Sequence, residues 1–312
     1  MLEYTLRKLG QGMIVVVLST VILFSLMQLM PGDPISMISD PLISDSKKQE
    51  MRVEWGLDKP APVRYLYWVK NVLKGDLGTS IVHKEPVMRV IMDRLPYTLL
   101  LMIPSTLIHY LISVPVGLIA AYKKNSIIDK TIVVSALILW SIPGFFIGIL
   151  LIKFISVDLA LLPISGYDGA KSLVLPITAL VLPGFASTLR IVRSEVLEVT
   201  RSRFVDTAYA KGLNTRRVLF GHILRNALIP TTVQFFLSIP GLIGGAIIIE
   251  NIFAIPGMGN LVFGAIAGHD YHIVQGFFLI TAILTVLSNT MGDVVAALLN
   301  PRIKLAMKGE KK

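Results

Sequence analysis

The sequence predicts an all-α membrane protein with about six transmembrane helices, and two observations lead to this prediction. Of the 312 residues, 54% are hydrophobic and only 16% are charged, and the mean hydropathy is +0.70. A soluble domain cannot bury that much apolar surface in one core. In addition, the apolar residues come in blocks of about 20, the length that a helix needs to cross the hydrocarbon of a bilayer.

Six blocks have this length, and each must form a helix because backbone polar groups in lipid need partners within the same segment. The first block follows Arg7 and Lys8, as a signal peptide would, but its apolar run is long and it lacks a small-x-small cleavage site. We therefore expect a retained anchor. Prolines within the other blocks, such as Pro143 and Pro183, are expected to kink the helices without ending them. The predicted spans are Met13–Met30, Thr98–Ala121, Ile132–Ile155, Val174–Val192, Ile229–Ile249 and Ile273–Leu299.

The distribution of lysine and arginine predicts the orientation. These residues gather at the N-terminus, after the second block, after the fourth block and in the C-terminal tail. By the positive-inside rule, both termini are expected in the cytoplasm. This placement accounts for most of the net charge of +10 without a nucleic-acid partner. The absence of cysteine excludes structural disulfides and thiolate metal sites.

The expected organisation follows from these spans. Its parts are a cytoplasmic stub with the first transmembrane helix (1–30), an external region (31–97), a five-helix core (98–300) that includes a cytoplasmic loop (193–228), and a basic cytoplasmic tail (301–312). In the external region, Tyr65, Tyr67 and Trp68 alternate with aliphatic residues, which predicts an amphipathic helix at the membrane surface with its aromatic rings at headgroup depth. A solvated cap with no chemistry is the alternative.

The cytoplasmic loop is too long and too regular for a simple connection. Val205, Ala208, Tyr209 and Gly212 fall at i, i+3, i+4 and i+7, which predicts one face of a short helix. Gly212 is expected to end that helix in the left-handed conformation. Asn214 or Thr215 can then cap a second short helix. A plain surface hairpin is the alternative.

The motifs of several enzyme classes are missing. The chain has no glycine loop of the Walker type, so we expect no ATPase site, no catalytic residues and no cofactor. Few ionisable residues fall within the predicted spans, among them His109, Lys153 and Asp293. An ion-coupled carrier usually needs paired charges at mid-membrane, so this pattern disfavours a stand-alone secondary carrier. That carrier and a non-transporting membrane scaffold stay open as alternatives.

Several short motifs occur in a characteristic order. Residues 206–212 read Asp-Thr-Ala-Tyr-Ala-Lys-Gly, and residues 224–230 read Leu-Arg-Asn-Ala-Leu-Ile-Pro. Further motifs lie at 31–34, 56–60, 75–80, 250–253, 256–259 and 300–302. Together they resemble the inner-membrane permease subunits of ATP-binding-cassette importers, and within these the B-type subunit of the dipeptide/oligopeptide (and nickel) group. The general family motif Glu-Ala-Ala-x-x-x-Gly is matched with Asp for Glu and Thr for the first Ala, whereas its later Ile-x-Leu-Pro is absent from 222–225.

The resemblance implies a multi-pass protein of the cell (plasma or inner) membrane with the type I importer fold. Its implied partners are a second homologous permease subunit in a heterodimer, two cytoplasmic ABC ATPase subunits, an extracytoplasmic solute-binding protein and membrane lipid. The implied substrates are peptides, with nickel chelates or oligosaccharides as the alternative.

The resemblance also implies two sets of site residues. The residues expected to couple the chain to the ATPase are Asp206, Thr207, Ala208, Lys211 and Gly212. Those expected at an external gate or in contact with the binding protein are Glu250, Phe253, Pro256, Gly257 and Gly259. For this second set, a structural re-entrant turn is the alternative.

Overall fold

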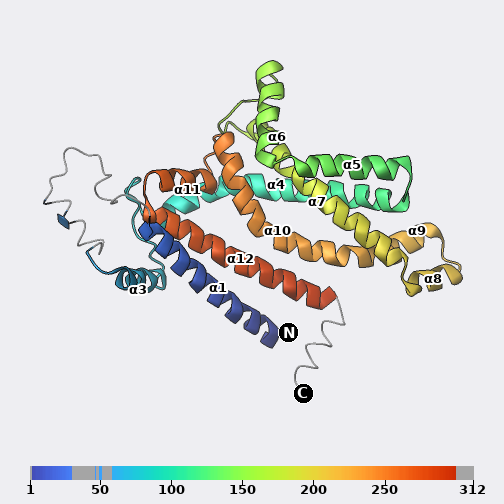
Figure 1. The fold of residues 1–312 in the computed structure, drawn as a ribbon, viewed down its shortest axis with the longest axis horizontal. Coiled ribbons are helices and arrows are strands. Elements are labelled where there is room, and N and C mark those ends of the chain that lie inside the picture. The colour runs from blue at the N-terminus through green and yellow to red at the C-terminus, as the bar shows by residue number, and fades with distance from the viewer. Residues whose placement is uncertain (1, 30–45, 47–48, 51–57, 300–312) are drawn as a thin grey trace.

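The computed structural model describes residues 2–29, 46, 49–50 and 58–299, and these residues form a bundle of helices (Figure 1). Within these ranges the only β-type pairing is an isolated bridge between Thr79 and Pro86. The all-α prediction is therefore confirmed. The motifs at 31–34 and 300–302, part of the motif at 56–60, and the basic tail lie outside the described residues.

The helices follow one another in a simple order. The α-helices are α1 (Leu2–Leu29), α3 (Ala61–Val72), α4 (Val87–Tyr122), α5 (Ile127–Ser141), α6 (Gly144–Leu151), α7 (Val174–Thr200), α8 (Arg203–Ala210), α9 (Thr215–Val218), α10 (Arg225–Ile252), α11 (Met258–Ala267) and α12 (Tyr271–Leu299). Two π-helical segments, η1 (Ile152–Asp158) and η3 (Leu219–Leu224), continue α6 and α9, and a 3₁₀ turn, η2 (Ala170–Leu173), precedes α7.

Four helices, α1, α4, α7 and α12, are long and apolar enough to cross a membrane. Two bent pairs raise this number to six if each pair counts as one span. One pair is α5 with α6 and η1, bent by 92°, and the other lies within the stretch from α9 to the end of α10, bent by 52°. The prediction of about six spans is confirmed.

The third predicted span differs most from the prediction, because it is broken and not merely kinked. Ile142 is extended, with φ −94° and ψ 122°, directly before Pro143. The proline ring disfavours a helical conformation in the preceding residue, so α5 ends there and α6 starts in a new direction. Figure 1 shows α6 standing away from the layer formed by the other long helices.

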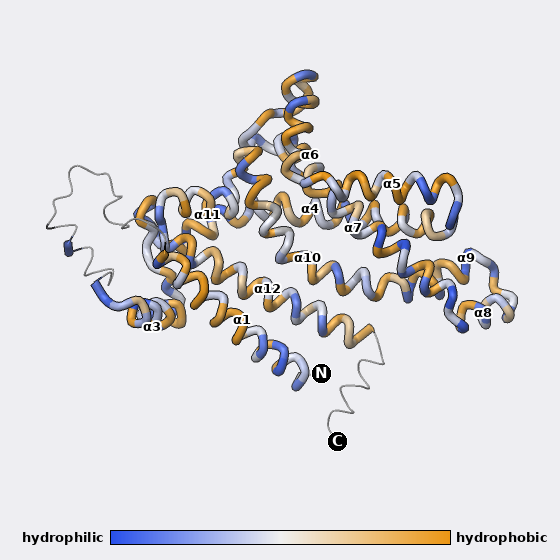
Figure 2. The backbone as a smooth tube through the Cα atoms, viewed as in Figure 1, coloured by the Kyte–Doolittle hydropathy of each residue, from blue (hydrophilic) through white to orange (hydrophobic). Residues whose placement is uncertain are grey.

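Other helices extend beyond the predicted spans. α7 continues to Thr200, past the predicted end at Val192, and α4 begins at Val87 where Thr98 was expected. Hydropathy marks only the part of a helix that lies in lipid, so polar turns that leave the bilayer are missed. Figure 2 shows such hydrophilic turns at the N-terminal end of α1 and around α8 and α9. These regions lie at the same end of the bundle, which is the end that the charge pattern predicts to be cytoplasmic.

Close helix packing holds the bundle together. α1 lies along α12, and an ion pair of 2.8 Å joins Lys8 Nζ to Asp293 Oδ2. α4 lies along α7, and at Gly117 a Cβ would come within 2.9 Å of Val192 Cβ and 3.0 Å of the Leu189 carbonyl oxygen. Glycine therefore allows α4 and α7 to approach more closely than any other residue would.

We predict that Gly117→Val lowers the stability of the purified protein, because the added side chain must push α4 away from α7. Overpacking of this kind costs about 1–3 kcal/mol. Gly10→Val is the matched control, since Gly10 also lies inside a long helix but a Cβ there has nothing within 4 Å. Thermal unfolding in detergent should give a lower Tm for the first variant only, and equal Tm values would contradict the packing account.

Candidate functional site

The segment between α7 and α10 forms a hairpin of two short helices, α8 and α9, called here the α8–α9 hairpin (residues 203–218). Val205 and Ala208 lie on its inner face and are 1% and 5% exposed. They belong to a cluster of buried apolar residues that joins α4, α7, α8, α9, η3 and α10, called here the cytoplasmic cluster after the side that the charge pattern predicts for it. Its members are Leu118, Ala121, Val192, Val196, Val205, Ala208, Val218, Ile223 and Ala227. The hairpin is therefore packed onto the ends of three long helices.

The outer face of α8 is exposed and carries charges of both signs together with aromatic rings. Its exposed residues include Arg203, Phe204, Asp206, Thr207 and Tyr209. Tyr209 was predicted on the same face as Val205 and Ala208, but those two residues are buried, whereas Tyr209 is 44% exposed. Phe204, Tyr209 and Arg203 are of the residue types that are enriched where proteins contact one another.

The end of α8 has the geometry of a Schellman motif, in which a left-handed residue redirects the chain. Gly212 has φ +78°, its N–H donates to the Tyr209 carbonyl at 2.9 Å, and the Leu213 N–H donates to the Ala208 carbonyl at 3.3 Å. The predicted left-handed stop is therefore confirmed. Asn214 caps α9 by accepting a bond of 2.8 Å from the Arg217 N–H, which decides between the two predicted caps.

The five predicted coupling residues lie together at this hairpin. Asp206, Thr207, Lys211 and Gly212 are exposed, and the Thr207 hydroxyl donates to the Arg203 carbonyl at 3.0 Å. Ala208 is buried, so it supports the hairpin from inside and cannot touch a partner. The structure therefore separates one supporting residue from four that face outward.

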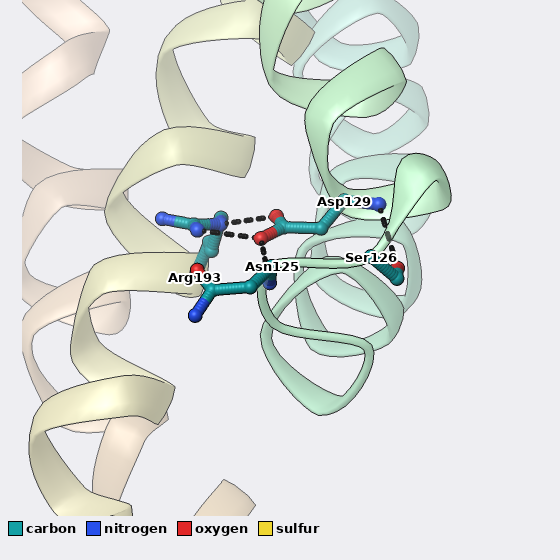
Figure 3. Close-up of polar contacts among 4 residues, drawn as sticks. All are labelled: Asn125, Ser126, Asp129 and Arg193. Atoms are coloured by element: carbon teal, nitrogen blue, oxygen red, sulfur yellow. Dashed lines mark hydrogen bonds and ion pairs between the residues drawn. The ribbon is translucent and has the colours of Figure 1, made fainter.

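A buried ion pair fixes the helices next to the hairpin (Figure 3). Arg193 of α7 donates from Nε to Asp129 Oδ1 at 2.6 Å and from Nη2 to Asp129 Oδ2 at 2.8 Å. Asp129 lies in the first turn of α5, where Ser126 caps the helix and the Asn125 N–H donates to Asp129 Oδ2 at 2.9 Å. The Asp129 side chain is 3% exposed, and its two oxygens accept all of these hydrogen bonds. Asp129 therefore holds the start of α5 against α7.

Sequence reasoning missed this pair. Arg193 was read only as one of the positive charges that set the orientation, and Asp129 was not singled out. A local signal was present, because Ser126-x-x-Asp129 has the spacing of a helix-capping motif. The pairing with Arg193 spans 64 residues, and no local pattern reports it.

At the opposite end of the bundle, Glu250 is fully buried between α10, α4 and α11. Its carboxylate accepts from the Thr98 hydroxyl at 2.6 Å, from the Gly259 N–H at 2.7 Å and from the Asn260 N–H at 3.0 Å. A Cβ at Gly257 would overlap this carboxylate. Glu250 thus holds the turn between α10 and α11 against α4.

The remaining residues of the external set lie in or beside the same turn. Phe253 is 2% exposed, within an apolar cluster that includes Leu175 and Ala179 of α7. Pro256 is partly exposed, and its carbonyl accepts from Arg94 Nη1 at 3.5 Å. The five residues are therefore brought together; four of them are buried, and only Pro256 among them is partly exposed.

A second buried carboxylate stabilises the same end. Asp270, which is fully buried before α12, accepts from the Ser80 hydroxyl at 2.5 Å and from the Val82 N–H at 3.2 Å. It ties the turn before α4 to the last helix. Across the ranges that the structure describes, no group of three His, Asp or Glu residues is arranged to hold a metal ion.

Comparison with protein families gives two matches. Residues 113–305 match the family described as "Binding-protein-dependent transport system inner membrane component". Residues 1–102 match the N-terminal family of the same membrane components. The two matches together cover nearly the whole chain.

Individual proteins give the same result. The chain is 38% identical to the oligopeptide transport system permease protein AppB of Bacillus subtilis, over 97% of this chain and 100% of that protein. It is 33% identical to the dipeptide transport system permease protein DppB of Escherichia coli, over 97% of this chain and 99% of that protein. Among solved structures, it resembles a chain of the inward-facing MetNI methionine ABC transporter with a TM-score of 0.58 at 18% identity, covering 68% of this chain and 97% of that chain.

We predict that Asp129→Ala destabilises the protein by about 2 kcal/mol, because it removes the charged hydrogen bonds to the Arg193 guanidinium, whose side chain is partly buried. The control is Lys153→Ala, which breaks the exposed pair with Asp158 and should cost about 1 kcal/mol or less. Chemical denaturation in detergent gives both values. A double-mutant cycle with Arg193→Ala should show coupling between the two residues, and strictly additive losses would contradict a direct interaction.

Proposed function

Since the chain belongs to the family of binding-protein-dependent transport system inner membrane components, we propose that it forms half of a path for peptides across the cell membrane, as a permease subunit of an ATP-binding-cassette importer. The peptide substrate is supported by two relatives at 33% and 38% identity, whose names specify dipeptide and oligopeptide transport. Both relatives align over nearly their whole length.

The proposal includes separate subunits for energy and for substrate delivery. The chain has no Walker glycine loop, so ATP hydrolysis is assigned to two cytoplasmic ATPase subunits. An extracytoplasmic binding protein delivers the peptide, and a second homologous permease completes the path as a heterodimer. The fold likeness to a chain of the MetNI transporter supports an arrangement of this kind.

The α8–α9 hairpin is the proposed contact with the ATPase. The observation that carries this proposal is the division of α8 into a buried face and an exposed face. Val205 and Ala208 hold the helix on the bundle, while Asp206 and Lys211 are exposed and can pair with charges on a partner. A push on the exposed face is then passed to α4, α7 and α10 through the cytoplasmic cluster, as a rigid-body movement.

The turn from Phe253 to Gly259 is the proposed external contact, either with the binding protein or as part of a gate. In this proposal Glu250 holds the turn in place and does not contact a partner, because its carboxylate already accepts three hydrogen bonds from within the protein. Pro256 is partly exposed and offers the contact surface. Movement of α10 would carry the turn with it, since Glu250 is part of that helix.

We predict that Asp206→Arg and Gly212→Val each abolish peptide uptake and substrate-stimulated ATP hydrolysis. The arginine reverses the charge offered to the partner, and valine strongly disfavours the φ of +78° that redirects the chain after α8. Membrane insertion should be unchanged. Uptake and ATPase activity are measured in vesicles that contain the whole transporter, and normal uptake by both variants would refute the coupling role.

Gly75→Val is the matched control for Gly212→Val. Gly75 ends α3 in the same way, with φ +83° and with the Gly75 and Asp76 N–H groups donating to the Val72 and Asn71 carbonyls. A Cβ has nothing within 4 Å at either glycine. Both variants thus carry the same backbone strain, and only the one on the cytoplasmic hairpin should uncouple ATP hydrolysis from uptake.

A further inference from the structure

The helix α3 lies across the C-terminal end of α1. Figure 1 shows α3 nearly end-on beside this end of α1. Two polar contacts join these helices. The Tyr65 hydroxyl lies 3.0 Å from Thr20 Oγ1, and Arg64 Nη1 donates to Gln28 Oε1 at 2.9 Å. The Tyr65 ring also meets the edge of Phe24, with ring centres 5.5 Å apart. Hence α3 is held at a defined height along a membrane-spanning helix.

That height corresponds to the boundary between hydrocarbon and headgroups. α1 ends at Leu29, and with a rise of about 1.5 Å per residue, Phe24 lies about 8 Å and Thr20 about 14 Å from that end. The hydrocarbon of one leaflet is about 15 Å thick. The contacts of α3 therefore run from Gln28 near that end to Thr20 deep in the outer leaflet, and their middle, at Phe24, lies at the depth of about 5–10 Å typical of interfacial amphipathic helices.

The two faces of α3 differ in their surroundings. Trp68 and Val72 are partly buried against an apolar cluster formed by residues of α1, α4, α10, α11 and α12 together with Leu77. The opposite face follows the spacing i, i+3, i+4, i+7, i+10 and i+11, continues past the end of α3 and is exposed. It consists of Val63, Leu66, Tyr67, Lys70, Leu73 and Lys74. Leu66 and Leu73 are 66% and 83% exposed, so this face presents aliphatic side chains next to lysines.

The lysines of this face carry charge that the described part of the chain does not neutralise. Lys70 and Lys74 have no ion-pair partner among the described residues. The nearby Asp76 carboxylate instead accepts a bond of 2.8 Å from the Gly78 N–H. Lysine side chains that start at such a helix can lay their alkyl stems along the apolar region and reach the phosphates with their ammonium groups.

We propose that the exposed face of α3 is a membrane-surface anchor that binds anionic phospholipid headgroups of the outer leaflet. Leu66 and Leu73 insert among the upper acyl carbons, Tyr67 lies at headgroup depth, and Lys70 and Lys74 bind phosphate groups. This binding would fix the height and the tilt of the outer end of α1 through the Tyr65 and Arg64 contacts. The proposal does not depend on the transport function.

A bilayer fits this face better than a protein that binds and leaves. More than half of the surface of Leu66 and of Leu73 is exposed. If the partner were transient, these side chains would be in contact with water whenever it was absent, which is unfavourable. A lipid leaflet, in contrast, is always present. The depth set by Thr20 and Phe24 also places the face in lipid before any other molecule arrives.

The natural absence of cysteine makes a direct test simple. Leu66→Cys and Leu73→Cys are each labelled with an environment-sensitive fluorophore on the full chain, assembled with its partner subunits in vesicles. Quenching by acyl-brominated phospholipid is compared with quenching by aqueous iodide. We expect the lipid quencher to be at least threefold more effective at both positions. The control is Lys84→Cys, in an exposed external turn, where iodide should be the more effective quencher.

Headgroup recognition is tested by changing the charge of the vesicles. Adding about one quarter phosphatidylglycerol to phosphatidylcholine should increase bromolipid quenching at Leu66→Cys about twofold, and the additional change Lys70→Glu should remove that increase. The matched control combines Leu66→Cys with Lys84→Glu, and this variant should retain the increase in bromolipid quenching. Iodide quenching of both α3 labels at the level of Lys84→Cys would overturn the proposal. The proposal would also be overturned if the α3 labels became protected from iodide only after a binding protein was added, because that result identifies a protein contact.

Discussion

The packing of α7 against its neighbours is the constraint on which the rest of the structure depends. α7 contacts α4, α5, α6 and α10, and it contributes to the apolar clusters at both ends of the bundle. Val192 and Val196 hold the α8–α9 hairpin at one end, and Ala179 lies in the cluster of Phe253 at the other. Because packed interiors deform little, one stiff helix connects the proposed ATPase contact to the proposed external contact.

Buried carboxylates define the ends of the bundle, while apolar packing fills its length. Asp129, Glu250 and Asp270 each lie at or near a helix end, and each accepts bonds from a different segment of the chain. A buried carboxylate is tolerated only when its oxygens are bonded, so each of them fixes the position of the groups that donate to it. Leucine and valine fit many arrangements equally well, and these three acids select one.

The sequence was sufficient to predict the class, the spans and the local form of the hairpin. The Gly212 stop and the Asn214 cap depend on neighbouring residues only; the stop was predicted, and Asn214 was one of the two predicted caps. Contacts between distant segments were not predicted, because no local pattern reports them. Arg193, the partner of Asp129, is 64 residues away, and Thr98, the donor to Glu250, is 152 residues away. The break after α5 was also missed, since Pro143 alone does not distinguish a kink from a turn of 92°.

The pairing of α1 with α12 has a consequence for the time course of synthesis. Lys8 and Asp293 are joined in the finished protein, yet Asp293 follows Lys8 by 285 positions along the chain. At about 5–20 residues per second, the ribosome needs roughly 14 to 57 seconds to make that stretch. During this interval α1 lacks the helix that runs alongside it, and α3, which is made earlier, contacts only its C-terminal part. The mean hydropathy of α1 is 2.3 over the spanning window, so α1 is stable in the bilayer until α12 has been synthesised.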